Sequence, residues 1–164
     1  MTGYREISFS DELLADGSVH RRFSDGRQEW RRRGPGPLVT WRDSQGRGGT
    51  DEPLGQRIIK RGYSTGQVVY GRDQGWGRTA WADRTLTVNR TLFTGRMGAL
   101  FAGVGAGVLL GAVVAPPLAL SPAEEDELRR QAQQRGDDSH GDGAGDRDWD
   151  DGGDGDGGSD DDFG

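Results

Sequence analysis

The chain contains no cysteine, only two histidines, and a single lysine among its 21 basic residues. Without cysteine, a disulfide bond, a thiolate zinc site and thiol-based catalysis are all excluded. Hydrophobic residues are also scarce, at 31% of 164 residues, and many of them lie in one segment, 97–120. A globular core outside that segment must therefore be small, and it depends on aromatic side chains such as Trp30, Trp41, Trp76 and Trp81.

The net charge of −6 hides an uneven distribution along the chain. Residues 1–96 contain 17 basic and 11 acidic residues and carry +6, whereas residues 121–164 contain 4 basic and 16 acidic residues and carry −12. An asymmetry of this size indicates that the two flanks of the apolar segment meet different surroundings or different partners.

Residues 1–95 predict a mainly β module. Residues 18–23 and 28–32 flank Asp25-Gly26, a pair that favours a tight hairpin turn, and residues 57–63 and 67–72 repeat the arrangement around Gly66. At an offset of 40 residues, Trp30 aligns with Tyr70 and residue 41 with residue 81. The pattern predicts two hairpin-containing units about 40 residues apart.

The segments between these hairpins predict turns and one further strand. Residues 34–37 (GPGP) predict a turn or linker and residues 44–53 a polar loop, while the alternation over residues 85–88 predicts a strand. The Gly-Trp and Tyr-Gly spacings that define WG and MORN repeats are not reproduced, so the pattern assigns no family.

Residues 97–120 carry no charged side chain and predict one transmembrane α-helix. A helix from Met97 to Ala115 would be about 28 Å long, close to the roughly 30 Å of a bilayer's hydrocarbon core. Small residues recur there at every fourth position: Ala99, Gly103, Gly107, Gly111 and Ala115. Such a face permits close helix packing and predicts self-association, although a high local frequency of Gly and Ala would produce the same stripe.

The end of the chain predicts a short helix followed by a disordered acidic tail. Ser121, Pro122 and Glu124 form a helix start, and Gly136 ends a helix over residues 121–135. Residues 136–164 are rich in Asp and Gly and cannot bury enough apolar surface to offset the entropy of ordering. The spacing of Asp146, Asp148 and Asp150 opens like a calcium loop, but Asp151 replaces its turn glycine, so no metal site is predicted.

Arginines gather around the first predicted hairpin, interleaved with Phe23 and Trp30. We expect these residues to bind an anionic surface, first of all membrane lipid headgroups: Arg21, Arg22, Arg27, Arg31, Arg32 and Arg33. Nucleic acid is the less favoured partner, and a plain solvated face is the alternative without a binding role.

No catalytic or cofactor-binding motif is present. His20 lies in the arginine-rich hairpin and His140 in the acidic tail, and neither belongs to a nucleophile elbow, a phosphate loop or a metalloprotease helix. The sequence therefore predicts a protein that is not an enzyme and that holds no cofactor.

These observations together predict a single-pass, membrane-anchored interaction or scaffold protein. Its β module would bind an unidentified protein partner or the anionic membrane surface. The module would lie in the cytoplasm and the acidic tail on the opposite side of the cell membrane, because a basic flank resists translocation. Two alternatives are a membrane-perturbing or pore-forming oligomer assembled through the glycine face, and a soluble assembly protein that buries the apolar helix in an oligomer.

Overall fold

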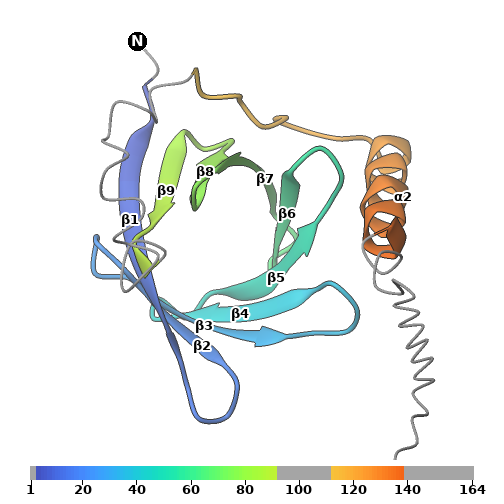
Figure 1. Cartoon of the computed structure of the whole chain (residues 1–164). Coiled ribbons are helices and arrows are strands. Elements are labelled where there is room, and N and C mark those ends of the chain that lie inside the picture. The colour runs from blue at the N-terminus through green and yellow to red at the C-terminus, as the bar shows by residue number, and fades with distance from the viewer. Residues whose placement is uncertain (1–2, 92–111, 139–164) are drawn as a thin grey trace, which may run out of the picture.

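The computed structural model describes residues 3–91 and 112–138, and Figure 1 shows the described strands arranged as a ring with one helix outside it. The predicted β-rich character is confirmed. The strands and the helix are β1 (Arg5–Leu13), β2 (Val19–Phe23), β3 (Gln28–Arg33), β4 (Val39–Asp43), β5 (Gly48–Pro53), β6 (Ile58–Tyr63), β7 (Val68–Gly75), β8 (Arg78–Trp81), β9 (Thr85–Asn89) and α2 (Pro122–Asp138).

The nine strands form one closed barrel. Each strand pairs antiparallel with the next, and β1 closes the ring by pairing in parallel with β9, where Ile7 lies opposite Thr87. The closing pair must be parallel because an antiparallel meander with an odd number of strands returns to the direction in which it began. Closure provides each described strand with a partner on both sides, which removes the exposed edges of an open sheet.

The barrel is built on a repeat of twenty residues, because the same turn recurs at 23–27, 43–47 and 63–67. In each turn the glycine has a positive φ, 90° at Gly26, 80° at Gly46 and 94° at Gly66. The serine two residues before each glycine donates its backbone amide to a carbonyl of the neighbouring strand, at 2.8 Å in all three turns. The three pairs are Ser24 with Ser8, Ser44 with Gln28, and Ser64 with Gly48. These three turns lie at the same end of the barrel.

The predicted fold of two units about 40 residues apart is therefore wrong. The forty-residue offset spans two copies of the twenty-residue repeat, and all copies belong to one barrel. The predicted polar loop over residues 44–53 contains β5. Its polar sequence conceals a strand because its inward side chain, Asp51, is buried among arginines instead of among apolar groups.

Helix α2 starts with the predicted cap and packs on the outside of the barrel. The Ser121 amide donates to Glu124 Oε2 at 2.7 Å, and the Glu124 amide donates back to Ser121 Oγ at 3.3 Å. The helix continues through Gly136 to Asp138, so the first residues of the predicted disordered tail are helical. The rest of that tail lies outside the described residues.

Apolar and charged contacts hold α2 against the barrel, beside β5 and β6 (Figure 1). Leu128 of the helix joins a buried cluster with Leu54, Ile58 and Tyr70. Around this cluster, Lys60 Nζ lies 2.6 Å from Glu125 Oε2 and Arg129 Nε lies 2.7 Å from Glu52 Oε1. The helix is thus fixed on the outer surface of the barrel by groups from several strands and turns.

The predicted transmembrane helix over 97–120 is wrong. Most of that segment lies outside the described residues, but residues 112–120 are described and are not helical. Gln74 exchanges two hydrogen bonds of 2.8 Å with the Val114 backbone, and Leu120 packs against the cluster beneath α2. Two adjacent prolines, 116 and 117, also oppose a helix here. Within the described part of the chain, no helix has the length and apolar character needed to cross a bilayer.

Candidate functional site

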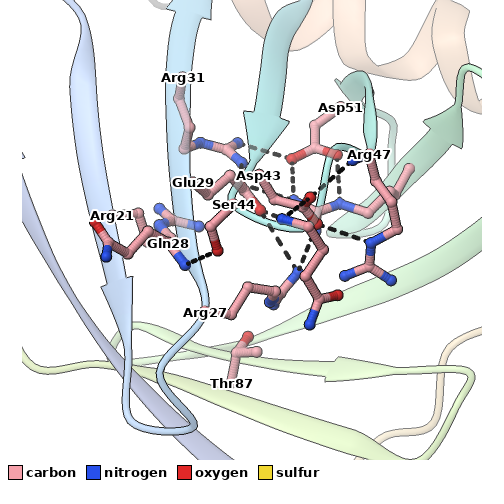
Figure 2. Close-up of polar contacts among 12 residues, drawn as sticks. Arg21, Arg27, Gln28, Glu29, Arg31, Asp43, Ser44, Arg47, Asp51 and Thr87 are labelled. Atoms are coloured by element: carbon pink, nitrogen blue, oxygen red, sulfur yellow. Dashed lines mark hydrogen bonds and ion pairs between the residues drawn. The ribbon is translucent and has the colours of Figure 1, made fainter.

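The inside of the barrel is ionic. Alternation along β3–β6 turns five charged side chains inward: Glu29, Arg31, Asp43, Asp51 and Arg61. Trp41 also faces inward, and the outward side chains include Trp30, Arg42 and Lys60. We call the buried charged residues the interior cluster: Arg27, Glu29, Arg31, Asp43, Asp51 and Arg61. Figure 2 labels all of them except Arg61 and shows their side chains converging, joined by hydrogen bonds and ion pairs.

Glu29 lies at the centre of the interior cluster, with a side chain that is 0% exposed. Its Oε1 accepts hydrogen bonds from Arg31 Nη1 and, at 3.3 Å, from Arg61 Nη2. Arg27 Nη1 lies 3.8 Å from the other carboxylate oxygen. Burying a carboxylate without compensating charge destabilises the folded state, so these three arginines are needed to stabilise the ionised Glu29 inside the barrel.

Asp51 is bound by two arginines of the interior cluster. Its two carboxylate oxygens accept hydrogen bonds of 2.8 Å from Nε and Nη2 of Arg61, and Arg31 Nη2 adds a third at 2.7 Å. Burial raises the pKa of Asp51, but the hydrogen bonds and charges of Arg61 and Arg31 outweigh it and hold that pKa below its ordinary value. Burial lowers the pKa of Arg61, and its carboxylate partners more than reverse the effect.

Asp43 connects the interior cluster to the repeated turns. Its carboxylate accepts the amides of Gln45 at 3.0 Å and Arg47 at 2.9 Å, as well as Arg47 Nε at 2.8 Å. Burial raises the pKa of Asp43, but the hydrogen bonds and charge of Arg47, together with the Gln45 amide, hold that pKa below its ordinary value. The turn at 43–47 is thereby tied to the charges inside the barrel.

Aromatic rings complete the interior. The Arg61 guanidinium lies 4.5 Å from the Trp41 ring centroid and 5.1 Å from that of Trp81. Each tryptophan pairs across the sheet with a glycine, Trp41 with Gly49 and Trp81 with Gly71. A methyl group on Gly71 would lie 2.8 Å from the Trp81 ring, so a side chain there would displace it. The small residues make room for the large rings.

The barrel separates the arginines that lie together in the sequence. Arg21, Arg27 and Arg31 point inward, and Arg21 binds both oxygens of Asp11 at 2.8 and 2.9 Å. Arg22 and Arg32 point outward to Glu12 and Asp16, at 3.1 and 2.6 Å, and Arg33 is exposed. The six arginines therefore do not form one surface.

Glu29, Asp43, Asp51 and Arg61 of the interior cluster were not predicted from the sequence as site residues. One pattern could have indicated them: Glu29 and Arg31 alternate along one strand in the way that apolar residues usually do. Such an alternation gives the strand an ionic inner face instead of an apolar one. Burying that face requires opposite charges on other strands, and Asp51 and Arg61 provide them.

A groove of about 710 Å³ lies on the outer surface of β3–β5. We call it the outer groove; its lining includes Trp30, Arg32, Thr40, Arg42, Gly46, Arg47, Gly48, Gly49 and Ser64. Trp30 is 41% exposed. Its ring stacks on His20 of the neighbouring strand, with a centroid separation of 4.9 Å and an interplanar angle of 9°. The groove thus combines an ordered, accessible aromatic ring with arginines.

Trp41 also lines the outer groove, although it is only 3% exposed. Its Nε1 donor is buried and has no hydrogen-bond partner in the structure. The ring lies inside the barrel, against Arg61, so this Nε1 does not provide a donor to the outer groove.

The residues of the predicted glycine stripe fall largely beyond the structure. Ala99, Gly103, Gly107 and Gly111 lie outside the described residues, and Ala115 is exposed in the non-helical segment. Within residues 3–91 and 112–138, no group of three His, Asp or Glu side chains is placed to hold a metal ion. No family model, curated protein or solved structure matches this chain.

Proposed function

We propose that this chain is a non-enzymatic interaction protein whose outer groove binds an extended, acidic segment of a partner protein. The observation that carries the proposal is the exposed Trp30 ring, stacked on His20 at the edge of a groove of about 710 Å³. Tryptophan and arginine together are the residues most enriched at the energetic centres of protein interfaces.

The charge of the groove selects the class of partner. Arg32, Arg42 and Arg47 line it, while the carboxylate of Asp43, its one acidic lining residue, is already bound by Arg47. An acidic segment would therefore complement the groove, and a basic segment would be repelled. Gly46, Gly48 and Gly49 carry no side chain, so a partner chain can approach this face of the barrel closely.

The interior of the barrel supports such a role, because a face that is already ordered costs little entropy on binding. The closed hydrogen-bonded ring and the interior cluster both restrain β3 and β4 from the inner side. Trp30 and Arg42 lie opposite each other on these two strands, so both are held in place before a partner arrives.

The proposal is tested with a fluorescein-labelled peptide of four Glu-Glu-Phe repeats, titrated with the full chain while fluorescence anisotropy is followed. The chain ending after Asp138 is measured in parallel, so that the chain's own acidic residues do not mask binding. We expect Trp30→Ala to weaken binding about tenfold or more, roughly 1.4 kcal/mol. Added salt should weaken it as well, because arginine–carboxylate attraction is screened.

The matched control is Trp76→Ala, which removes an even more exposed tryptophan, 48% accessible, from the turn between β7 and β8. This variant should bind the peptide like the parent. Equal losses in both variants, or absence of binding to the parent, would contradict the proposal. Binding to phosphatidylserine vesicles that does not depend on Trp30 would instead support an anionic membrane surface as the partner.

A further inference from the structure

A cavity of about 280 Å³ opens at the end of the barrel that carries the three repeated turns. Position 27 of the first turn and position 47 of the second are both arginine, so the repeat places two guanidinium groups at the same opening. Arg61 lines the cavity from within, and Tyr63 and Trp81 supply its aromatic walls. We call this opening the arginine mouth.

Arg27 has donors that the interior cluster does not use. Its Nη1 lies 3.8 Å from Glu29 and 4.0 Å from Asp43, and both separations are longer than a hydrogen bond. The guanidinium is instead stacked on the Phe23 ring, 3.9 Å from its centroid. Its side chain is 15% exposed and none of its nitrogens is buried without a partner, so its free donors are open to the cavity. Burial lowers the pKa of both Arg27 and Arg61, but only for Arg61 do the carboxylate partners more than reverse the effect.

The opposite end of the barrel provides an internal comparison. The cavity there is larger, about 480 Å³, and the arginines that line it are Arg21, Arg31 and Arg61. Each of these three donates to a carboxylate at 2.9 Å or less. Five arginines and two aspartates, Asp25 and Asp83, line the arginine mouth. The carboxylates of both aspartates are engaged by backbone amides, of Arg27 and Thr85, at 3.0 Å. Arg21 and Arg61 line both ends and Arg47 donates to Asp43 at 2.8 Å, so the arginine with unused donors beside the interior cluster is Arg27.

We propose that the arginine mouth binds a small oxyanion, a phosphate or carboxylate group, between Arg27, Arg47 and Tyr63. Guanidinium groups match the geometry of such anions with paired N–H donors, and the interaction strengthens where water is partly excluded. The volume lies near the lower limit of small-molecule sites, so it admits the anion with only a few further atoms. This site shares Arg47 with the outer groove but no other lining residue, and its test does not depend on the proposed function.

Inorganic phosphate and succinate serve as probes for the full chain, each titrated by isothermal calorimetry against a background of constant ionic strength made with sodium chloride. We expect at least one of them to bind with a dissociation constant below about 1 mM, and which one binds identifies the source of the oxyanion. Arg27→Gln should weaken binding at least tenfold, and Tyr63→Phe should weaken it less. Arg22→Gln, on the outer face of β2, should leave it unchanged.

Each variant is compared with the parent by near-ultraviolet circular dichroism without probe, and Tyr63→Phe provides a second test should Arg27→Gln fail to fold. Weaker binding by a folded Arg27→Gln or Tyr63→Phe variant, with Arg22→Gln like the parent, supports the proposal. Absence of binding of both probes up to 10 mM, or equal binding by the parent and both mouth variants, would overturn it.

Discussion

Glu29 is the residue on which the interior cluster depends most, because it is fully buried and contacts three arginines. In Glu29→Gln the carboxylate charge is lost while the volume is kept, so Arg27, Arg31 and Arg61 retain only two aspartates between them. We expect the free energy of unfolding to fall by about 3 kcal/mol, the usual result of leaving a buried charge uncompensated. Urea denaturation followed by circular dichroism measures the change.

The matched control is Glu12→Gln, which breaks a pair of the same type on the surface. Glu12 and Arg22 are 54% and 58% exposed, so water already screens their attraction. We expect a loss of less than about 1 kcal/mol. If the two variants were equally stable, the interior cluster would contribute no more than a surface ion pair does.

At the scale of elements, sequence patterns predict the strands whose turns carry a clear hairpin signal. Asp25-Gly26 and Gly66 mark the turns of β2–β3 and β6–β7, and the alternation of Leu86 and Val88 marks β9. β5 was missed because Asp51 occupies its buried inward position. Hydrophobic periodicity cannot detect a face that is buried against opposite charges, so the interior cluster emerged only from the structure.

The contact between α2 and the turn at 54–57 depends on the absence of a side chain at Gly55. Its amide donates to the Leu128 carbonyl at 2.8 Å, and an added Cβ would lie 2.9 Å from that carbonyl and 2.8 Å from the Gln131 side chain. We expect Gly55→Ala to cost about 1–3 kcal/mol and to raise hydrogen exchange in α2. Gly62→Ala, whose Cβ would meet Thr50 at 3.6 Å, should leave α2 protected. Equal protection in both variants would contradict the close approach.

For the whole molecule, closure of the ring lies beyond local sequence patterns, because the β1–β9 pair joins residues about 80 positions apart. The apolar segment 97–120 illustrates the opposite error. Its composition satisfies the length and charge criteria for a membrane span, yet the described residues 112–120 are not helical, and Leu120 packs beside α2. Composition shows only how apolar a segment is. Whether the segment packs against lipid or against the rest of the protein depends on tertiary contacts, which a local sequence pattern does not contain.

Acid should destabilise the whole barrel through the carboxylates that its arginines hold ionised. The pKa values of Asp51 and Asp43 are lower in the folded protein than their ordinary value of about 3.9, so at low pH the unfolded chain binds more protons than the folded one. The stabilisation is therefore complete above about pH 4 and is lost as the pH falls through the lower, folded values. Thermal denaturation between pH 7 and pH 2 should show a steep fall below about pH 4. Asp51→Asn should be less stable at pH 7 and show a shallower fall, since it has no carboxylate to protonate at that position. Parallel profiles for the parent and this variant would show that acid acts elsewhere in the molecule.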